Sequence, residues 1–449
     1  MRKSGFILLA VCLSLLMGLT GCQGTTGNGQ TEPNETINVT DPGGQNGSRN
    51  ETATQNDPAA QKDPNKERHS MNIKPSPTDY LSEEQMALAD SYAASSEAAL
   101  AAVMRKAERG EPVTIAAIGG SITMGTISQG SKDNEVSERK MYAEIFRDWW
   151  TETFPESEVT WINAGIGATD SYLGVHRVQV DVLDHDPDLV LVEFSVNDED
   201  NIVSKTNYDN LVRRILKSES EPAVMLLFMA QTSLVSAQNQ HQAVGFPYAL
   251  PMLSYRNVIK DLMESGTYTA KDLSGDEVHP SALGHRIAGE MIWKYLNSVY
   301  EAADTYEEPE TFSKKPVTKE KYLDSRILGS KELEITDKGT FEESRVFEAF
   351  PDDLSTGSGD GELTFTATFK NLGILYYRQT DGKGGQFEVF VDGEKAALLD
   401  ADFTGGWGNY ADAKEVFSSE EAGLHTVVIK KSPDSRGEEF SLLGVLVSE

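Results

Sequence analysis

Cysteine is nearly absent from this chain of 449 residues, and its two cysteines, Cys12 and Cys22, both lie near the N-terminus. Disulfides stabilise many exported proteins, and thiolates serve as nucleophiles and metal ligands. The chain beyond residue 22 can use neither. Its stability must therefore come from packed cores, and the chain is long enough to form two of them.

Positive charge is also scarce. The chain has 40 lysines and arginines against 71 aspartates and glutamates, for a formal net charge of −31. Such an acidic surface repels nucleic acid and anionic lipid head groups. We therefore expect no nucleic-acid partner and no electrostatic attachment to a membrane.

Large apolar side chains are missing from residues 23–70, which contain no Leu, Met, Phe, Trp or Tyr. A segment of this composition cannot bury enough apolar surface to offset the entropy of ordering it. We predict that residues 22–80 form a disordered tether, with a root-mean-square reach of roughly 40 Å.

The first residues have the pattern of an export signal. A basic start at Arg2 and Lys3 precedes an apolar run that ends in Leu-Thr-Gly-Cys at Cys22. This pattern predicts a signal peptide over residues 1–21. The ending resembles a bacterial lipobox, and the alternative is a plain signal peptide. The resemblance implies a lipidated Cys22, which would anchor the protein to the membrane at the bacterial cell surface, on the outer side of the cytoplasmic membrane.

Residues 81–305 alternate short apolar runs with amphipathic stretches. Strands are predicted at 113–118, 158–163, 188–195 and 223–229, with helices at about 137–153, 170–184, 205–218, 251–265 and 281–303. A further helix is predicted from a capping box at Ser82 to Arg109. This alternation indicates an α/β domain with a parallel sheet covered on both faces, whose ligand site lies beyond the carboxyl ends of the strands.

The composition and the pattern of apolar residues change after residue 305. Residues 306–335 are rich in Lys and Glu and are predicted to be a connector. Over 336–449, apolar and polar residues alternate in short runs, as in Leu363–Phe369. This alternation predicts a small all-β domain, a sandwich or jelly roll.

The sequence Ile-Gly-Gly-Ser-Ile-Thr-Met directly follows the first predicted strand and contains Ser121. Glycines allow a tight turn that lifts a hydroxyl out at the sheet edge, where a serine can act as a nucleophile. An ordinary turn is the alternative.

A nucleophilic serine needs a base and an orienting carboxylate. Of seven histidines, His279 stands three residues after Asp276, at the start of a predicted helix. The alternative role for Asp276 is to cap that helix. We place His241 in a polar loop and His285 on the polar, solvent-facing side of the helix.

Two more strands end at the same rim. The turn after Asn163 offers backbone N–H groups at 165–168, and the next strand is followed by Asn197. Together with the N–H of Ser121, these groups can surround a developing oxyanion. Glycine-rich turns and helix caps are the alternative reading of both.

These motifs resemble the four blocks of the SGNH (GDSL-like) hydrolases over about residues 110–303. The blocks are Gly119-Gly120-Ser121, Asn163-Ala164-Gly165, Val196-Asn197-Asp198 and Asp276-x-x-His279. The resemblance implies a flavodoxin-like three-layer α/β/α fold. It also implies Ser121 as the nucleophile, His279 as its base and Asp276 as the residue that orients the base.

The chain departs from the family pattern at three positions. Gly120 stands where Asp is usual before the serine, and Ser195 stands where Gly is usual in the third block. The second oxyanion donor falls on Ala168 where Gly is usual, with Gly165 and Gly167 as alternative donors. The Cβ of an alanine narrows the backbone angles available there.

A hydrolase followed by a jelly roll resembles several bacterial carbohydrate esterases. We therefore expect an esterase that removes acetyl or other small acyl groups from a polysaccharide, with no metal or organic cofactor. Trp407, Tyr410 and Tyr376 are candidates for stacking on sugar rings, or else core aromatics. The alternatives are acyl transfer to a glycan, hydrolysis of a lipid or thioester, and a glycan-binding lipoprotein with a decayed triad.

Overall fold

The computed structural model describes residues 72–90, 96–128, 140–358 and 361–449. The predicted signal peptide, Cys22 and most of the predicted tether lie outside these ranges. Within them, no helix is both long enough and apolar enough to cross a membrane.

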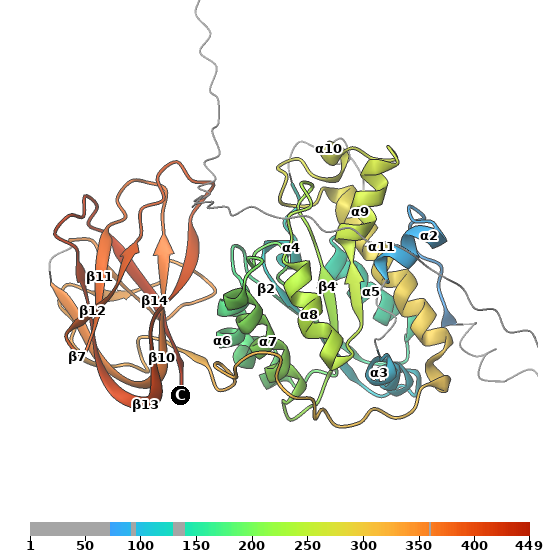
Figure 1. The fold of residues 1–449 in the computed structure, drawn as a ribbon, viewed down its shortest axis with the longest axis horizontal. Coiled ribbons are helices and arrows are strands. Elements are labelled where there is room, and N and C mark those ends of the chain that lie inside the picture. The colour runs from blue at the N-terminus through green and yellow to red at the C-terminus, as the bar shows by residue number, and fades with distance from the viewer. Residues whose placement is uncertain (1–71, 91–95, 129–139, 359–360) are drawn as a thin grey trace, which may run out of the picture. The chain divides into compact units, whose positions relative to one another are not determined.

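Five parallel strands form one sheet in the order β2-β1-β3-β4-β5 (Figure 1). The strands are β1 (Val113–Gly119), β2 (Val159–Gly165), β3 (Leu189–Glu193), β4 (Ala223–Phe228) and β5 (Met252–Ser254). This is the flavodoxin-like strand order, and it confirms the predicted parallel α/β fold. The short strand β5 was missed and lies in a segment predicted to be helical. A strand of three residues is too short to show an alternating sequence pattern.

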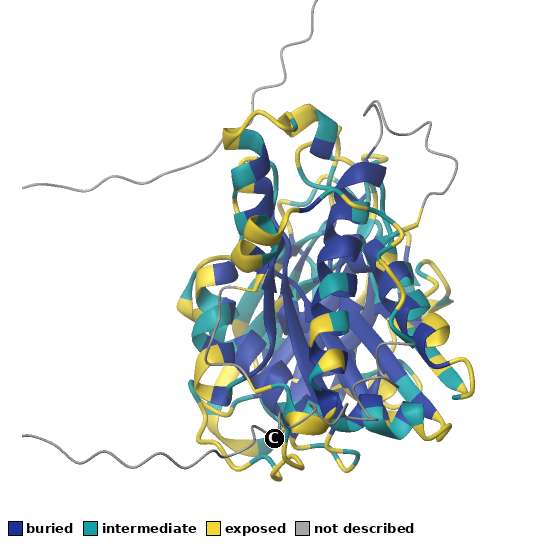
Figure 2. Cartoon of the chain, turned by 90° about the vertical axis from the view of Figure 1, so that its right-hand side faces the viewer, coloured by how far each residue is buried: buried dark blue, intermediate teal, exposed yellow. Residues whose placement is uncertain are grey.

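Alternate residues of β1 face two different cores. Ile115 and Ala117 face a core built with α2 and the other helices of one face, whereas Ala116 and Ile118 face the helices of the other. The first face holds α2 (Glu83–Ala89), α3 (Ala98–Glu108), α5 (Tyr142–Thr153), α9 (Tyr255–Glu264) and α11 (Ala282–Glu301), and the second α6 (Ser171–Asp181), α7 (Ile202–Leu216) and α8 (Gln238–Tyr248). Figure 2 shows the buried sheet between helices whose outer faces are exposed.

The carboxyl ends of three neighbouring strands, β2, β1 and β3, coincide. Gly119, the last residue of β1, pairs with Gly165 of β2 on one side and with Glu193 of β3 on the other. The turns that follow these strands therefore begin at one level of the sheet, as the sequence predicted. This edge carries the candidate site.

The N-terminal part of this domain differs from the prediction. The helix predicted from Ser82 to Arg109 is two helices, α2 and α3, although the capping box at Ser82 is present. The segment before α2 is bound and not free. Glu290 of α11, which is fully buried, accepts hydrogen bonds from the backbone N–H groups of Tyr80 and Leu81 at 2.8 and 2.9 Å. The predicted tether is thus too long at its C-terminal end.

The C-terminal part of the chain is an antiparallel β domain with strands joined in the order β12-β11-β13-β10-β14-β9-β8, and with β6 on β14 and β7 on β10. The strands are β6 (Arg326–Leu328), β7 (Glu334–Asp337), β8 (Glu342–Ser344), β9 (Asp353–Thr356), β10 (Glu362–Arg378), β11 (Gln386–Val391), β12 (Glu394–Asp400), β13 (Tyr410–Lys431) and β14 (Phe440–Ser448). Leu363, Phe365 and Phe369 all point into its core, as their alternation predicted.

The predicted connector is not a free linker. It contains β6 and the start of β7, and its backbone is bound to α7. The side-chain oxygen of Asn210 accepts hydrogen bonds from the N–H groups of Lys321 and Tyr322, at 2.7 and 2.9 Å. Leu375 and Leu446 of the β domain pack into the same core as α6 and α7. One hydrophobic core therefore continues from the α/β domain into the β domain.

Candidate active site

Ser121 is the first residue of a short helix, α4 (Ser121–Met124), that follows β1 after a single residue. The turn is very tight: a Cβ at Gly119 would lie 2.0 Å from Oγ1 of Thr123 and 2.4 Å from the carbonyl oxygen of Glu193. Gly125 ends the helix at φ 109°, in the left-handed region that glycine tolerates. These glycines let the chain place a half-buried hydroxyl at the carboxyl edge of the sheet.

The structure brings Ser121, His279 and Asp276 together. Nε2 of His279 lies 3.0 Å from Oγ of Ser121, and Nδ1 lies 2.9 Å from Oδ2 of Asp276. The other carboxylate oxygen accepts the backbone N–H groups of Val278 and His279, at 3.0 and 2.8 Å. Ser281, not Asp276, caps α11, so the carboxylate of Asp276 faces the imidazole.

The carboxylate of Asp276 stays charged because of these contacts. Partial burial raises its pKa, but the hydrogen bonds from the ring and backbone of His279 outweigh that effect and lower the pKa overall. A charged carboxylate holds a proton on Nδ1 and leaves Nε2 free to accept the proton of Ser121. The arrangement has the geometry of a nucleophile, a base and an orienting group.

Ser128 and His285 join the loop that carries His279 to the turn that carries Ser121. Ser128 donates its N–H to the carbonyl of Pro280 at 3.0 Å and accepts the N–H of Gly275 at 2.8 Å. Nε2 of His285 lies 3.0 Å from the carbonyl oxygen of Thr126. These contacts fix the distance between the two halves of the site.

The placement of His285 on the helix surface was therefore wrong. The residue is fully buried, and burial lowers the pKa of its imidazole to about 4. Its Nδ1 accepts the N–H of Tyr142 at 3.4 Å, so Nε2 carries the proton that it donates to Thr126. Its polarity is satisfied by two backbone groups, which a helical projection of one sequence does not reveal.

The turn after β2 narrows the choice of oxyanion donor. The N–H of Gly165 is already donated to Oδ1 of Asn163 at 3.0 Å, which leaves Gly167 and Ala168. Ala168 has φ 61°, the left-handed conformation that favours glycine, which accounts for the usual glycine at this position. A Cβ at Gly167 would lie 4.0 Å from Cβ of Ser121, so this turn borders Ser121.

Asn197 explains the unusual Gly120. A Cβ at Gly120 would lie only 2.5 Å from Oδ1 of Asn197. The carboxamide of Asn197 thus rests against the backbone next to Ser121. The aspartate that is usual in the family would collide with it unless Asn197 moved.

Ser195, which stands where the third block usually has glycine, makes hydrogen bonds to the buried side chain of Glu193. The backbone N–H of Ser195 donates to Oε1 of Glu193 at 3.0 Å, and its hydroxyl lies 2.9 Å from the same oxygen. Burial raises the pKa of Glu193 to about 7, against the lowering effect of these two hydrogen bonds. The side chain is fully buried at the end of β3.

We expect Glu193→Gln to stabilise the protein at alkaline pH. The native carboxyl keeps its proton up to about pH 7, whereas an unfolded one loses it near its ordinary pKa of about 4.3, so wild-type stability falls as pH rises between these values. Glutamine accepts the same hydrogen bonds and does not titrate. Its thermal midpoint should match wild type at pH 4 and exceed it by roughly 2–4 °C at pH 8. A lower midpoint for the variant at pH 8 contradicts this expectation.

Three side chains at the site were missed by sequence reasoning. Arg177 is buried in α6 and donates to the carbonyl oxygens of Gly119 and Ala164, at 2.9 and 2.7 Å, which ties the ends of β1 and β2 together. Asp198 and His241 form a second buried pair, with 2.9 Å between Oδ2 and Nε2. The placement of His241 in a polar loop was wrong, because the residue lies within α8 and is fully buried.

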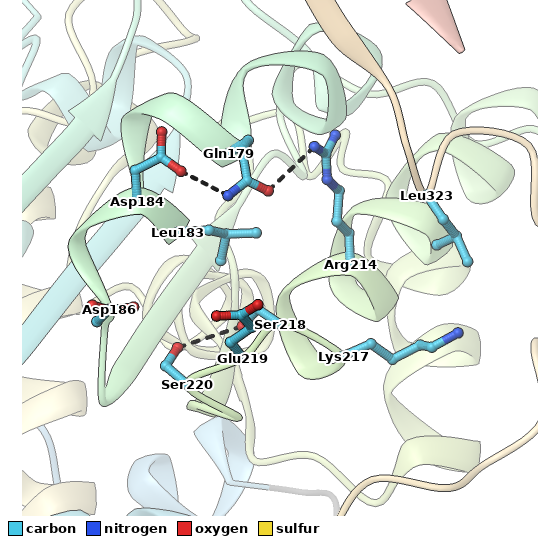
Figure 3. Close-up of a pocket in the computed structure, with 10 residues that line it drawn as sticks. All are labelled: Gln179, Leu183, Asp184, Asp186, Arg214, Lys217, Ser218, Glu219, Ser220 and Leu323. Carbon is cyan, nitrogen blue, oxygen red and sulfur yellow. Dashed lines mark hydrogen bonds between the residues drawn. The ribbon is translucent and has the colours of Figure 1, made fainter. Parts of the chain in front are cut away.

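A separate hollow of about 510 Å³ lies away from these residues (Figure 3). It is lined by the C-terminal ends of α6 and α7, including Gln179 and Arg214, and by Asp184 in the short 3₁₀ helix η2 (Leu183–His185) that follows α6. Both helices start at the carboxyl edge of the sheet, so this hollow lies at the opposite edge. Among the described residues no group of three or more His, Cys, Asp or Glu side chains could hold a metal ion.

Comparison with known proteins agrees with this geometry. Residues 117–287 match the model of the GDSL-like lipase/acylhydrolase family. No curated protein sequence matches the chain.

Two crystal structures resemble both domains. One is a two-domain esterase active on acetylated mannans, at 28% identity and a TM-score of 0.72, covering 79% of this chain and 96% of that one. The other is the two-domain esterase co-crystallised with mannopentaose, at 28% identity and a TM-score of 0.70, covering 79% and 95%. The order of the motifs, the fold and these matches together show that the chain carries a hydrolase domain of the GDSL-like lipase/acylhydrolase (SGNH) family.

Proposed function

We propose that this protein is a serine esterase that removes acetyl or other small acyl groups from a polysaccharide. The observation that carries the proposal is the hydrogen-bonded series from Ser121 through His279 to Asp276 at the carboxyl edge of the sheet. The resemblance to an esterase active on acetylated mannans, which extends over both domains, supports acetylated mannan as the first substrate to test.

In the proposed mechanism, Oγ of Ser121 attacks the ester carbonyl while Nε2 of His279 takes its proton. The oxyanion is stabilised by the N–H of Ser121, by the turn at Gly167 and Ala168 and by the amide of Asn197. The tetrahedral intermediate then collapses, its C–O bond to the sugar breaks, and the imidazolium gives its proton to the departing sugar oxygen, which leaves an acyl-enzyme. Water, deprotonated by His279, attacks the acyl-enzyme, and collapse of the second tetrahedral intermediate releases the acid and restores Ser121.

The β domain has an aromatic surface suited to a sugar ring. Trp407 is 70% exposed and stacks on Tyr410, with ring centroids 5.0 Å apart. Asp170 caps α6 directly after the proposed oxyanion turn, and its pKa is raised by desolvation first, then by the charges of Asp198 and of Asp412, which lies two residues further along β13. The start of β13, whose first residue is Tyr410, therefore lies near the rim of the site. We propose that Trp407 and Tyr410 hold the glycan.

Tyr376 does not belong to this surface. It is buried, its ring stacks on Phe440 at 5.7 Å, and its hydroxyl donates to Asp412 at 2.8 Å. Tyr376 is thus a core aromatic of the β domain, the alternative that the sequence left open.

Trp407→Ala should weaken binding of the polymer without affecting the chemistry. We expect KM for acetylated mannan to rise roughly 5- to 10-fold, because about 1 kcal/mol of stacking is lost. Hydrolysis of p-nitrophenyl acetate should be unchanged. Leu424→Ala is the matched control, since Leu424 is an equally exposed apolar residue of the same domain. Equal effects of the two substitutions on KM would exclude a specific role for Trp407.

The direct test of the proposed activity is release of acetate by the purified protein from acetylated mannan, acetylated xylan and p-nitrophenyl acetate. Adding a glycan acceptor and analysing the products separates hydrolysis from acyl transfer. Long-chain p-nitrophenyl esters and acyl thioesters test the other hydrolase activities. No release from any acetylated glycan, combined with rapid cleavage of long-chain esters, would overturn the proposed substrate class.

We further propose that lipidated Cys22 anchors the enzyme to the outer side of the cytoplasmic membrane. The lipobox-like sequence supports this placement. Mass spectrometry of the mature N-terminal peptide should show a diacylglyceryl cysteine, and Cys22→Ser should abolish this modification. An unmodified Cys22 in the membrane fraction would contradict the proposal.

A further inference from the structure

Asp198 connects the two turns that flank the proposed oxyanion. It follows Asn197 directly, and its side chain is 1% exposed. Oδ1 accepts the N–H of Ser171 at 2.8 Å, and Ser171 begins α6, three residues after Ala168. The carboxylate of Asp198 thus links the turn that carries Asn197 to the start of α6, which follows the turn that carries Ala168.

His241 supplies the partner of the second carboxylate oxygen. Its Nε2 lies 2.9 Å from Oδ2 of Asp198, and its ring is fully buried. The ring stacks face to face on Tyr208, with centroids 3.6 Å apart and planes 4° apart. Packing therefore fixes the orientation of the imidazole before it meets the carboxylate.

The helix that carries His241 is itself bound to the third-block turn. The N–H of Ala237, at the start of α8, donates to the carbonyl oxygen of Ser195 at 2.7 Å. His241 lies one helical turn further on and returns to Asp198. The turn that presents Asn197 is thus held to α8 at two points, by its backbone and by its side chain.

A buried carboxylate needs such a partner here. Buried Glu193 and partly buried Asp170 lie nearby, and desolvation, together with the charge of Asp198, raises the pKa of each to about 7. Leaving one oxygen of Asp198 without a donor in this acidic surrounding is costly, so the side chain would rotate or draw in water. Either change moves the backbone that positions Asn197.

On this geometry we propose that His241 and Asp198 are positioning residues of the oxyanion hole. His241 holds Asp198, and Asp198 holds Asn197 and the start of α6 in the arrangement that stabilises the tetrahedral intermediate. Neither side chain touches the substrate. The inference rests on the proposed function, since it assigns the pair to the same reaction.

The test compares His241→Phe with His241→Gln. Phenylalanine keeps the stack on Tyr208 and loses the N–H, whereas glutamine retains an N–H for Asp198. We expect His241→Phe to lower kcat for p-nitrophenyl acetate by about 30- to 300-fold with KM within about twofold, because the effect falls on the transition state. We expect His241→Gln to recover most of kcat. Labelling of Ser121 by a fluorophosphonate should slow in parallel.

His176→Phe is the matched control. His176 is also buried, and its Nδ1 lies 2.7 Å from the carbonyl oxygen of Tyr172, but it has no contact with the third-block turn. We expect His176→Phe to lower the thermal midpoint about as much as His241→Phe does, but to keep kcat within about threefold of wild type. Equal losses of kcat in the two phenylalanine variants would overturn the positioning role.

Two further outcomes are decisive. If His241→Phe does not fold, Asp198→Asn replaces it, because asparagine preserves the side-chain shape, and an unchanged kcat in that variant overturns the inference. Wild type that reacts with the fluorophosphonate but releases no acetate from glycans refutes the proposed substrate alone. In that case the labelling rates of the variants still decide the role of the pair.

Discussion

Replacing Ser121 by alanine is expected to lower kcat for p-nitrophenyl acetate by about 10⁴-fold or more. The substitution removes the only atom that can form the proposed acyl-enzyme, while the base, the orienting carboxylate and the oxyanion donors remain. The residual rate should then come from direct attack of water on the bound ester, whose carbonyl the oxyanion donors still polarise, without an acyl-enzyme. Fluorophosphonate labelling should disappear completely.

This loss should occur without a loss of stability. Ser121 is half-buried, and its hydroxyl contacts only a partly exposed imidazole, so alanine leaves neither a cavity nor a buried unpaired group. The thermal midpoint should stay within about 2 °C of wild type. Ser298→Ala is a suitable control, because the hydroxyl of Ser298 bonds only within α11, to the carbonyl oxygen of Tyr295. Equal acetate release by wild type and Ser121→Ala would refute the serine mechanism.

Asp276→Asn is expected to have the second largest effect, a loss of roughly 10²- to 10⁴-fold in kcat. An amide N–H₂ facing Nδ1 of His279 favours the tautomer with the proton on Nε2, which cannot accept the proton of Ser121. The upper end of the range applies to a buried carboxylate. The side chain of Asp276 is 45% exposed, so water can partly replace the charge and the effect can lie below that limit.

The control for this substitution is Asp272→Asn, which changes a partly exposed carboxylate four residues earlier in the chain. Asp272 accepts the N–H and the hydroxyl of Thr269 in the capping box of α10 (Ala270–Leu273). Its loss should lower stability slightly and leave kcat near wild type. If Asp276→Asn and Asp272→Asn lower kcat equally, Asp276 does not orient the base.

The main elements of the proposed site follow from local patterns in the sequence. Ser121, the 165–168 turn and Asn197 each follow an apolar run of strand length, and parallel strands bring their carboxyl ends to one edge. That rule requires no knowledge of side-chain packing. The pairing of Asp276 with His279 was equally accessible, because three residues separate them and one turn of chain brings them together.

The residues that hold the site together were less accessible. His241 is 43 residues from Asp198 in sequence, and Arg177 is 58 residues from Gly119 and 13 from Ala164. Both residues occur in stretches without a clear apolar face. His285 was misplaced for a related reason. A polar side chain is buried where backbone groups from distant segments still need a hydrogen-bond partner. A single sequence does not show which groups those are.

Gly120 illustrates the same limit. In the sequence it marks a departure from the family pattern, with no stated cause. In the structure, a Cβ at Gly120 would lie 2.5 Å from Oδ1 of Asn197, so the glycine leaves the space that this side chain fills. The two residues are a matched pair, and neither can be interpreted without the other.

The sequence by itself determined the class of fold, the order of the strands' terminal motifs and the residues proposed for the chemistry, because these depend on periodicity and chain direction. Only the tertiary structure decided how the two oxyanion turns are joined, which N–H of the second turn is already used, and that Tyr376 is core whereas Trp407 is surface. Those properties arise from contacts between segments far apart in the chain. Their energies depend on burial and on hydrogen-bond geometry, which exist only once the chain has folded.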